Sequence, residues 1–136
     1  MRPYLIFTRL IALMVMLQAA FIALGTFTIL NDADDGKRID PDDYNAGQAL
    51  HSIGAMVLSL LVIIALIVAL TKYKAARKHA GLLFLVVLLQ WVFAMIAFEA
   101  PIAGLLHGAN AIVILAVAIR AEVMAKATNT SEPVTV

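Results

Sequence analysis

The sequence predicts an all-α membrane protein, a bundle of four transmembrane helices that run up, down, up and down. Of its 136 residues, 63% are apolar and only 14% are charged, which excludes most soluble and disordered classes. Four stretches of about 20 residues are nearly free of charge, and a helix of that length crosses the hydrocarbon core of a bilayer. They take up most of the chain, so we expect one small membrane domain over residues 1–136.

The four predicted spans cover residues 10–30, 46–71, 80–98 and 102–119. Each is too long for a strand and too apolar for a half-exposed soluble helix. The first resembles the start of a secretory signal peptide, but its length, its Gln18 and the lack of a small-x-small cleavage site favour a retained span. Residues 31–45 are interpreted as an acidic outer loop and residues 128–136 as a short cytoplasmic tail. Within the loop, Asp40 and Pro41 favour a helix start.

Basic residues predict the orientation of the chain in the membrane. Cytoplasmic flanks of membrane spans carry an excess of Lys and Arg. Only Lys37 and Arg38 lie in the predicted outer loop, and the other eight basic residues flank the spans on the opposite side. We therefore expect a multi-pass plasma membrane protein of a bacterium with both termini in the cytoplasm. The lipid bilayer is its expected partner, and no nucleic acid is expected.

The acidic outer loop invites a calcium interpretation, because an acidic stretch that contains glycine can resemble an EF-hand loop. Its spacing is poor. Counted from Asn31, Ala33 stands at the third ligand position, and Asp42 stands where a bidentate Glu belongs. A solvated loop is the favoured interpretation.

The membrane part contains an internal repeat. Residues 12–25, ALMVMLQAAFIALG, resemble residues 84–97, FLVVLLQWVFAMIA, and this alignment pairs Gln18 with Gln90. The segment HSIGAMVLSLLVI from His51 resembles HGANAIVILAVAI from His107. The first span is thus related to the third and the second to the fourth. This relation predicts two helical hairpins joined by a pseudo-twofold axis along the membrane normal.

His51 and His107 occupy matched places in the repeat. Each lies five residues past the start of its span, about 7 Å along the helix at about 1.5 Å per residue. In an up-down-up-down bundle the second and fourth spans lie on a diagonal, so the two imidazoles can face each other across the central axis. An ionisable side chain is costly in the hydrocarbon and is by default a candidate functional residue. His79, at the cytoplasmic edge, is interpreted as solvated.

Two opposed histidines without further polar ligands match the iron of haem b. Haem iron takes two axial ligands because the porphyrin fills its other four positions. Zinc needs three or four protein ligands, and the chain has no cysteine and no carboxylate beside the histidines within the spans. His51 and His107 are therefore predicted as axial ligands of haem iron. Residues near them that we expect to line the cofactor are Gly47, Gly54, Ala55, Gly104, Gly108, Ala111, Gln18 and Gln90.

The pattern around the histidines resembles one half of haem A synthase, a membrane enzyme built from two similar four-helix halves, each with a His on its second and fourth helices. The resemblance covers nearly the whole chain, through short motifs at Arg9-Leu10, Leu17-Gln18, His51, LLQ at residues 88–90 and HGANA at residues 107–111. It implies that His51 and His107 are axial ligands of a haem near the outer face.

The chain also departs from that family. It has one half only, and therefore one haem site where the family has two. The family's catalytic half has a Glu three residues before the second-helix His and commonly an Arg after it, whereas this chain has Gln48 and Ser52. These differences favour a cofactor-holding half or a separate cytochrome over an enzyme that hydroxylates a haem methyl.

Two classes of function therefore stay open. The first is a b-type haem protein that carries one electron or handles haem, with a quinol or an outer-face protein as redox partner, and that is a carrier more than a catalyst. The second is a cofactor-free accessory subunit of a larger membrane complex, in which the histidines, glutamines and glycines only join helices. A transporter is disfavoured because the spans show neither a carboxylate nor a broken helix.

Overall fold

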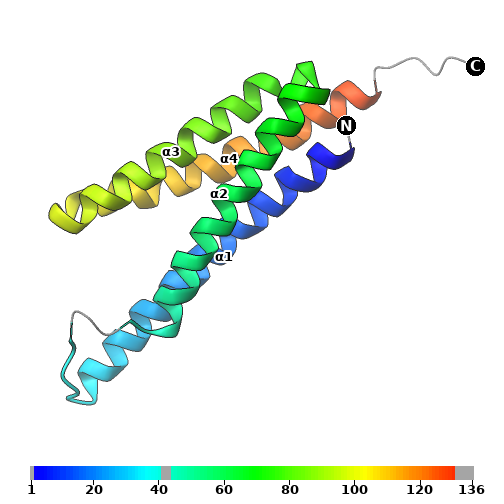
Figure 1. Cartoon of the computed structure of the whole chain (residues 1–136). Helices are drawn as coiled ribbons and strands as arrows, with labels where there is room; N and C mark the ends of the chain where they lie inside the picture. Colours follow the sequence, from blue (N-terminus) through cyan, green and yellow to red (C-terminus); the bar gives the residue numbers. More distant parts are fainter. Residues whose placement is uncertain (1, 41–43, 131–136) are drawn as a thin grey trace, which may run out of the picture.

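The chain folds as the predicted bundle of four antiparallel helices (Figure 1). The computed structural model describes residues 2–40 and 44–130, the last three of them by their backbone alone. The helices are α1 (Arg2–Asp34), α2 (Ala46–Lys72), α3 (Arg77–Glu99) and α4 (Ile102–Thr130), and a short 3₁₀ turn, η1 (Lys74–Ala76), joins α2 to α3. All four are long and apolar enough to cross a membrane, so the chain is a multi-pass membrane protein by length and composition.

The helices extend beyond several of the predicted spans. α1 begins at Arg2 and ends at Asp34, inside the predicted outer loop, and α4 continues to Thr130, inside the predicted tail. Hydropathy marks only the part of a helix that lies in the hydrocarbon, so the polar turns beyond it give no signal. The remainder of the predicted tail, residues 131–136, lies outside the described residues.

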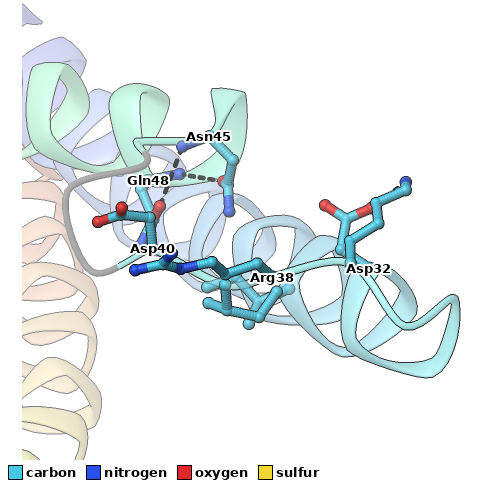
Figure 2. A pocket seen from close by; sticks show the side chains of 8 residues that line it. Asp32, Arg38, Asp40, Asn45 and Gln48 are labelled. Carbon is cyan, nitrogen blue, oxygen red and sulfur yellow. Dashed lines mark hydrogen bonds and ion pairs between the residues drawn. The ribbon is translucent and has the colours of Figure 1, made fainter.

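The second span does not begin at the helix start favoured at Asp40 and Pro41, of which Pro41 lies outside the described residues. α2 begins at Ala46 with Asn45 as its N-cap. The Asn45 side chain accepts from the Gln48 backbone N–H at 3.1 Å, and the Gln48 side chain accepts from the Asn45 N–H at 3.0 Å (Figure 2). The Asn45 amide also donates to the Gly25 carbonyl of α1 at 3.0 Å, a contact between helices that local sequence does not reveal. Asp40 is not helical, and residues 41–43 lie outside the described part.

The two hairpins, α1–α2 and α3–α4, pack together at one end and diverge at the other (Figure 1). We call the end with Arg2, η1 and Thr130 the termini end, and the end with Asp35, Asn45 and the Ala100–Pro101 turn the acidic-loop end. Contacts between the hairpins join α1 to α4 and α2 to α3, so α2 and α4 lie on a diagonal, as do α1 and α3. This arrangement confirms the predicted up-down-up-down order.

The hydrophobic core fills mainly the half of the bundle toward the termini end. Its fully buried members include Ile11 of α1, Val62 of α2, Leu83 of α3 and Ile114 of α4. Buried alanines on α2 and α4 take up little space between these helices and their neighbours there. An ion pair of 2.9 Å between Arg9 and Glu122 also joins α1 to α4. Outward faces are apolar, as expected of a surface in contact with lipid.

Gly25 of α1 and Gly47 of α2 bring the two backbones of the first hairpin close together. A methyl group added to Gly47 would lie 2.1 Å from the Gly25 nitrogen and 2.5 Å from its Cα, both backbone atoms that cannot turn aside. The position therefore requires glycine, as in other close helix pairs in membranes. Together with the Asn45 bond to Gly25, it fixes how α2 leaves the acidic-loop end.

We predict that Gly47→Ala lowers the free energy of unfolding by about 1–3 kcal/mol, because the methyl group forces α1 and α2 apart. Gly81→Ala is the matched control, since Gly81 also lies in a helix but its added methyl group would meet nothing within 4 Å. The control is expected to hold or raise stability by up to about 1 kcal/mol. Reversible unfolding in detergent measures both, and equal stability of the two variants would contradict the tight contact.

Candidate functional site

His51 of α2 and His107 of α4 face each other across the diagonal of the bundle. Their ring centroids lie 6.2 Å apart, and the ring planes are inclined by 61°. Both side chains are half-buried, at the level where the closed core gives way to the diverging hairpins. The equal height follows from the matched positions of the two residues in the repeat.

Each histidine is held by the glutamine of the preceding helix in its own hairpin. His51 Nδ1 lies 3.1 Å from the Gln18 carbonyl oxygen, and His107 Nδ1 lies 3.1 Å from the Gln90 carbonyl oxygen. A carbonyl oxygen only accepts hydrogen bonds, and the Gln90 amide nitrogen faces His107 Nε2, so His107 carries its proton on Nδ1 and its lone pair on Nε2. The same contact in both hairpins is what the sequence repeat predicts.

The side chains of the two glutamines behave differently. Gln18 turns toward the backbone of α2, where its amide, with the nitrogen facing His51, donates to the His51 carbonyl at 2.8 Å and accepts from the Ala55 N–H at 3.1 Å. That nitrogen also donates to His51 Nδ1 at 2.8 Å, so His51 Nδ1 faces both this donor and the Gln18 carbonyl acceptor. Gly54 makes room for this amide, since an added Cβ would lie 1.9 Å from it. All Gln18 contacts thus fall on the Nδ1 edge of His51, away from Nε2.

Gln90 instead covers the other nitrogen of its histidine. Its amide nitrogen lies 3.1 Å from His107 Nε2, and its amide oxygen accepts from Asn110 at 2.7 Å. Asn110 is buried and also donates to the Val86 carbonyl at 2.8 Å. In the repeat, Asn110 corresponds to Gly54. The second hairpin therefore has a hydrogen-bond donor to the Gln90 amide at the position where the first hairpin has space for the Gln18 amide.

Two cavities flank the histidine pair, and His51, His107 and Ile22 line both. The larger, of about 400 Å³, lies on the side of α2 and α3, and the smaller, of about 280 Å³, on the side of α1 and α4. Their combined size falls in the usual range for small-molecule and cofactor sites, roughly 300–1,000 Å³. A flat ligand between the rings would extend into both.

The structure places the predicted lining residues in two groups. Ala55 and Gln90 line the larger cavity, and Gln18, Gly108 and Ala111 line the smaller one. Gly47, Gly54 and Gly104 line neither of them. Gly47 and Gly54 lie against α1, and the nearest contact of Gly104 is Ala97 on α3. Sequence spacing does not separate a glycine that opens a cavity from one that brings helices together.

Several residues of the larger cavity were not among the predicted site residues. Trp91 of α3 lines it and donates from Nε1 to the Ser59 hydroxyl of α2 at 2.9 Å. Ser52 also lines the larger cavity, and the Ser52 hydroxyl is hydrogen-bonded to the Tyr44 hydroxyl. Nothing in the sequence marked these residues as part of a site. The one available clue was that Trp91 directly follows Gln90, a predicted site residue.

A third hollow, of about 270 Å³, lies beside the acidic loop (Figure 2). Asp32, Arg38, Asp40 and Gln48 are among its lining residues. The carboxylate of Asp32 is paired with Lys37 at 2.6 Å, and this partner raises the pKa of Lys37. Across residues 2–40 and 44–130, no three or more His, Cys, Asp or Glu side chains are grouped so that they could hold a metal ion. The described part of the loop is therefore a salt-bridged surface segment.

Gln48, where the resembling family's catalytic half carries Glu, belongs to the helix cap described above. Its amide oxygen bonds the Asn45 backbone, and it borders the loop hollow, not the two cavities beside the histidines. An amide also cannot take up or release a proton as a carboxylate does.

Comparison of the chain with protein-family models, curated proteins and solved structures finds no match. The resemblance to haem A synthase therefore stays a prediction from the sequence.

We predict that Asn110→Ala lowers the free energy of unfolding by about 1–2 kcal/mol, because it removes two hydrogen bonds from a buried site inside the bundle. Asn31→Ala is the matched control, since the Asn31 side chain is exposed and makes only one long hydrogen bond among the described residues, of 3.5 Å to Asp35. Chemical unfolding in detergent checks both variants. An Asn110 variant as stable as the control would show that the network contributes nothing to the fold.

Proposed function

We propose that the chain is a membrane haem protein in which His51 and His107 are the axial ligands of a b-type haem. One observation carries this proposal: two imidazoles face each other 6.2 Å apart with Nδ1 held by backbone carbonyls. Two metal–imidazole bonds of about 2 Å, each continued by about 1 Å to the ring centre, span about 6 Å. Histidines that bind metals usually donate their other N–H to a carbonyl or carboxylate, as His107 does here to the Gln90 carbonyl.

The surrounding residues fit a flat macrocycle. The two cavities lie on opposite sides of the line between the rings, and their walls are mostly apolar. Gly108, Ala111 and Ala55 keep these walls close to the histidines without bulky side chains. The donor set also suits haem better than a bare ion, because two imidazoles leave most coordination positions of a bare ion unfilled.

A bound haem supplies a one-electron couple between ferric and ferrous iron. His51 and His107 would both hold the iron of such a haem, which would leave no open position for oxygen and favours electron transfer or haem handling over oxygen chemistry. The Gln18 and Gln90 carbonyls keep the rings oriented, and the apolar walls keep water from them. The use of Gln48 as a helix cap agrees with a carrier more than with a hydroxylase.

The redox partner we propose is a quinol in the membrane or a protein at the outer face. The larger cavity lies between α2 and α3, and it has apolar walls with polar groups from Ser52, Ser59 and Gln90. The charge distribution of the sequence predicts that the acidic-loop end lies outside the cytoplasm, and the histidines lie in that half of the bundle. Both kinds of partner can approach a haem at this depth.

The second candidate is a cofactor-free accessory subunit of a larger membrane complex. The observation that favours it is the contact between the Gln90 amide and His107 Nε2, which satisfies this ring within the protein alone. His51 Nε2, by contrast, has no hydrogen bond from the described residues. If the two histidines only joined helices, His51 Nε2 would have no role.

We predict that the purified protein shows the absorption spectrum of a haem with two imidazole ligands, and that His51→Ala and His107→Ala each abolish this spectrum. His79→Ala is the matched control, because His79 lies in the first turn of α3 and lines neither cavity. It is expected to keep the spectrum unchanged. Optical absorption and electron paramagnetic resonance spectra of the wild type and the three variants test this prediction.

Colourless wild-type protein that stays colourless after haem is added to it, while circular dichroism shows intact helices, would refute the haem proposal and support the accessory subunit. A spectrum that survives both histidine substitutions would refute the assignment of the ligands.

A further inference from the structure

The two histidines differ at the nitrogen that a metal would bind. His107 Nε2 is covered by the Gln90 amide at 3.1 Å, whereas no hydrogen bond from the described part of the chain reaches His51 Nε2. The pseudo-twofold repeat predicts equivalent environments for the two rings. The difference therefore comes from the side chains around each ring and not from its place in the fold.

Asn110 determines how Gln90 covers the ring. It donates to the Gln90 amide oxygen at 2.7 Å, so the amide nitrogen is the atom that points to His107. An amide nitrogen donates and the Nε2 lone pair accepts, which agrees with the proton on Nδ1. The chain Val86–Asn110–Gln90–His107 is thus a consistent series of donors and acceptors.

Gln90 is also placed where it can move. Its side chain is only half-buried and lines the larger cavity, so it has space to turn into. Its backbone carbonyl holds His107 Nδ1 independently of the side chain. Rotation of the amide away from Nε2 would leave the orientation of the ring unchanged.

We propose that Gln90 caps His107 in the empty site, so that haem binds first through His51 and gains its second ligand only when it displaces Gln90. This inference rests on the proposed haem function. In the exchange, the hydrogen bond from Gln90 to Nε2 breaks and an iron–nitrogen bond to the same lone pair forms. The proton stays on Nδ1, and nothing is oxidised or reduced.

We predict that haemin added to the haem-free full-length protein in detergent binds in two spectral phases. The first depends on haemin concentration and gives the spectrum of a single-histidine haem, and the second is independent of concentration and gives the two-imidazole spectrum. Gln90→Leu should speed the second phase about tenfold, the factor expected for one buried hydrogen bond. Stopped-flow absorption measures both phases.

Gln48→Leu is the matched control, because it makes the same chemical change at a glutamine that lines neither cavity beside the histidines. Its second phase should run at the wild-type rate. Asn110→Ala retains Gln90 but releases its amide, and a smaller acceleration is expected.

A double-variant comparison tests the same inference at equilibrium. Adding Gln90→Leu to His51→Ala should raise haemin affinity about tenfold, since only the capped His107 is then available. Adding it to His107→Ala should change nothing. Equal effects in both backgrounds would overturn the inference.

The outcomes separate this inference from the proposed function. A two-imidazole spectrum at equilibrium, together with a second phase that Gln90→Leu leaves unchanged, overturns the capping by Gln90 alone. Failure of the wild-type protein to bind haemin through either histidine overturns both.

Discussion

The contact between each histidine Nδ1 and the glutamine carbonyl of the neighbouring helix, 3.1 Å in both hairpins, is the interaction on which the site depends. It fixes which edge of each ring faces the centre of the bundle. In a membrane interior a hydrogen bond is strengthened by the low dielectric constant. Because the acceptor is a backbone carbonyl, the orientation of the ring depends on the spacing of the helices, which the packing of each hairpin sets.

That packing is unevenly distributed. Large buried side chains such as Ile11, Leu83 and Ile114 hold the four helices together toward the termini end, while the hairpins diverge toward the acidic-loop end (Figure 1). The first hairpin stays closely paired through Gly25 and Gly47 even where it has left the second. A closed half therefore supplies rigidity, and an open half supplies the cavities. The histidines lie at the boundary, where they are fixed and accessible at the same time.

Sequence reasoning reached the four-helix order and the matched height of the two histidines, because both follow from hydropathy and repeat spacing. It missed the start of α2, since the Asn45 cap is stabilised by Gly25 from another helix. It identified Gln18 and Gln90 as a pair but could not distinguish their roles, which depend on Gly54 and Asn110 at one repeat position. Nor could it separate the glycines of the cavities from those of the helix contacts, because spacing along a helix does not define its rotation against its neighbours.

Trp91 is the single tryptophan of the chain, and it lies in the wall of the larger cavity with its indole nitrogen bonded to Ser59. The ultraviolet emission of the protein therefore comes almost entirely from one ring beside the histidine pair. A molecule that enters this cavity is expected to change the Trp91 fluorescence. It can do so by contact with the indole, by breaking the hydrogen bond to Ser59, or by energy transfer if it absorbs light. The protein thus carries its own optical reporter for occupancy, without an attached dye.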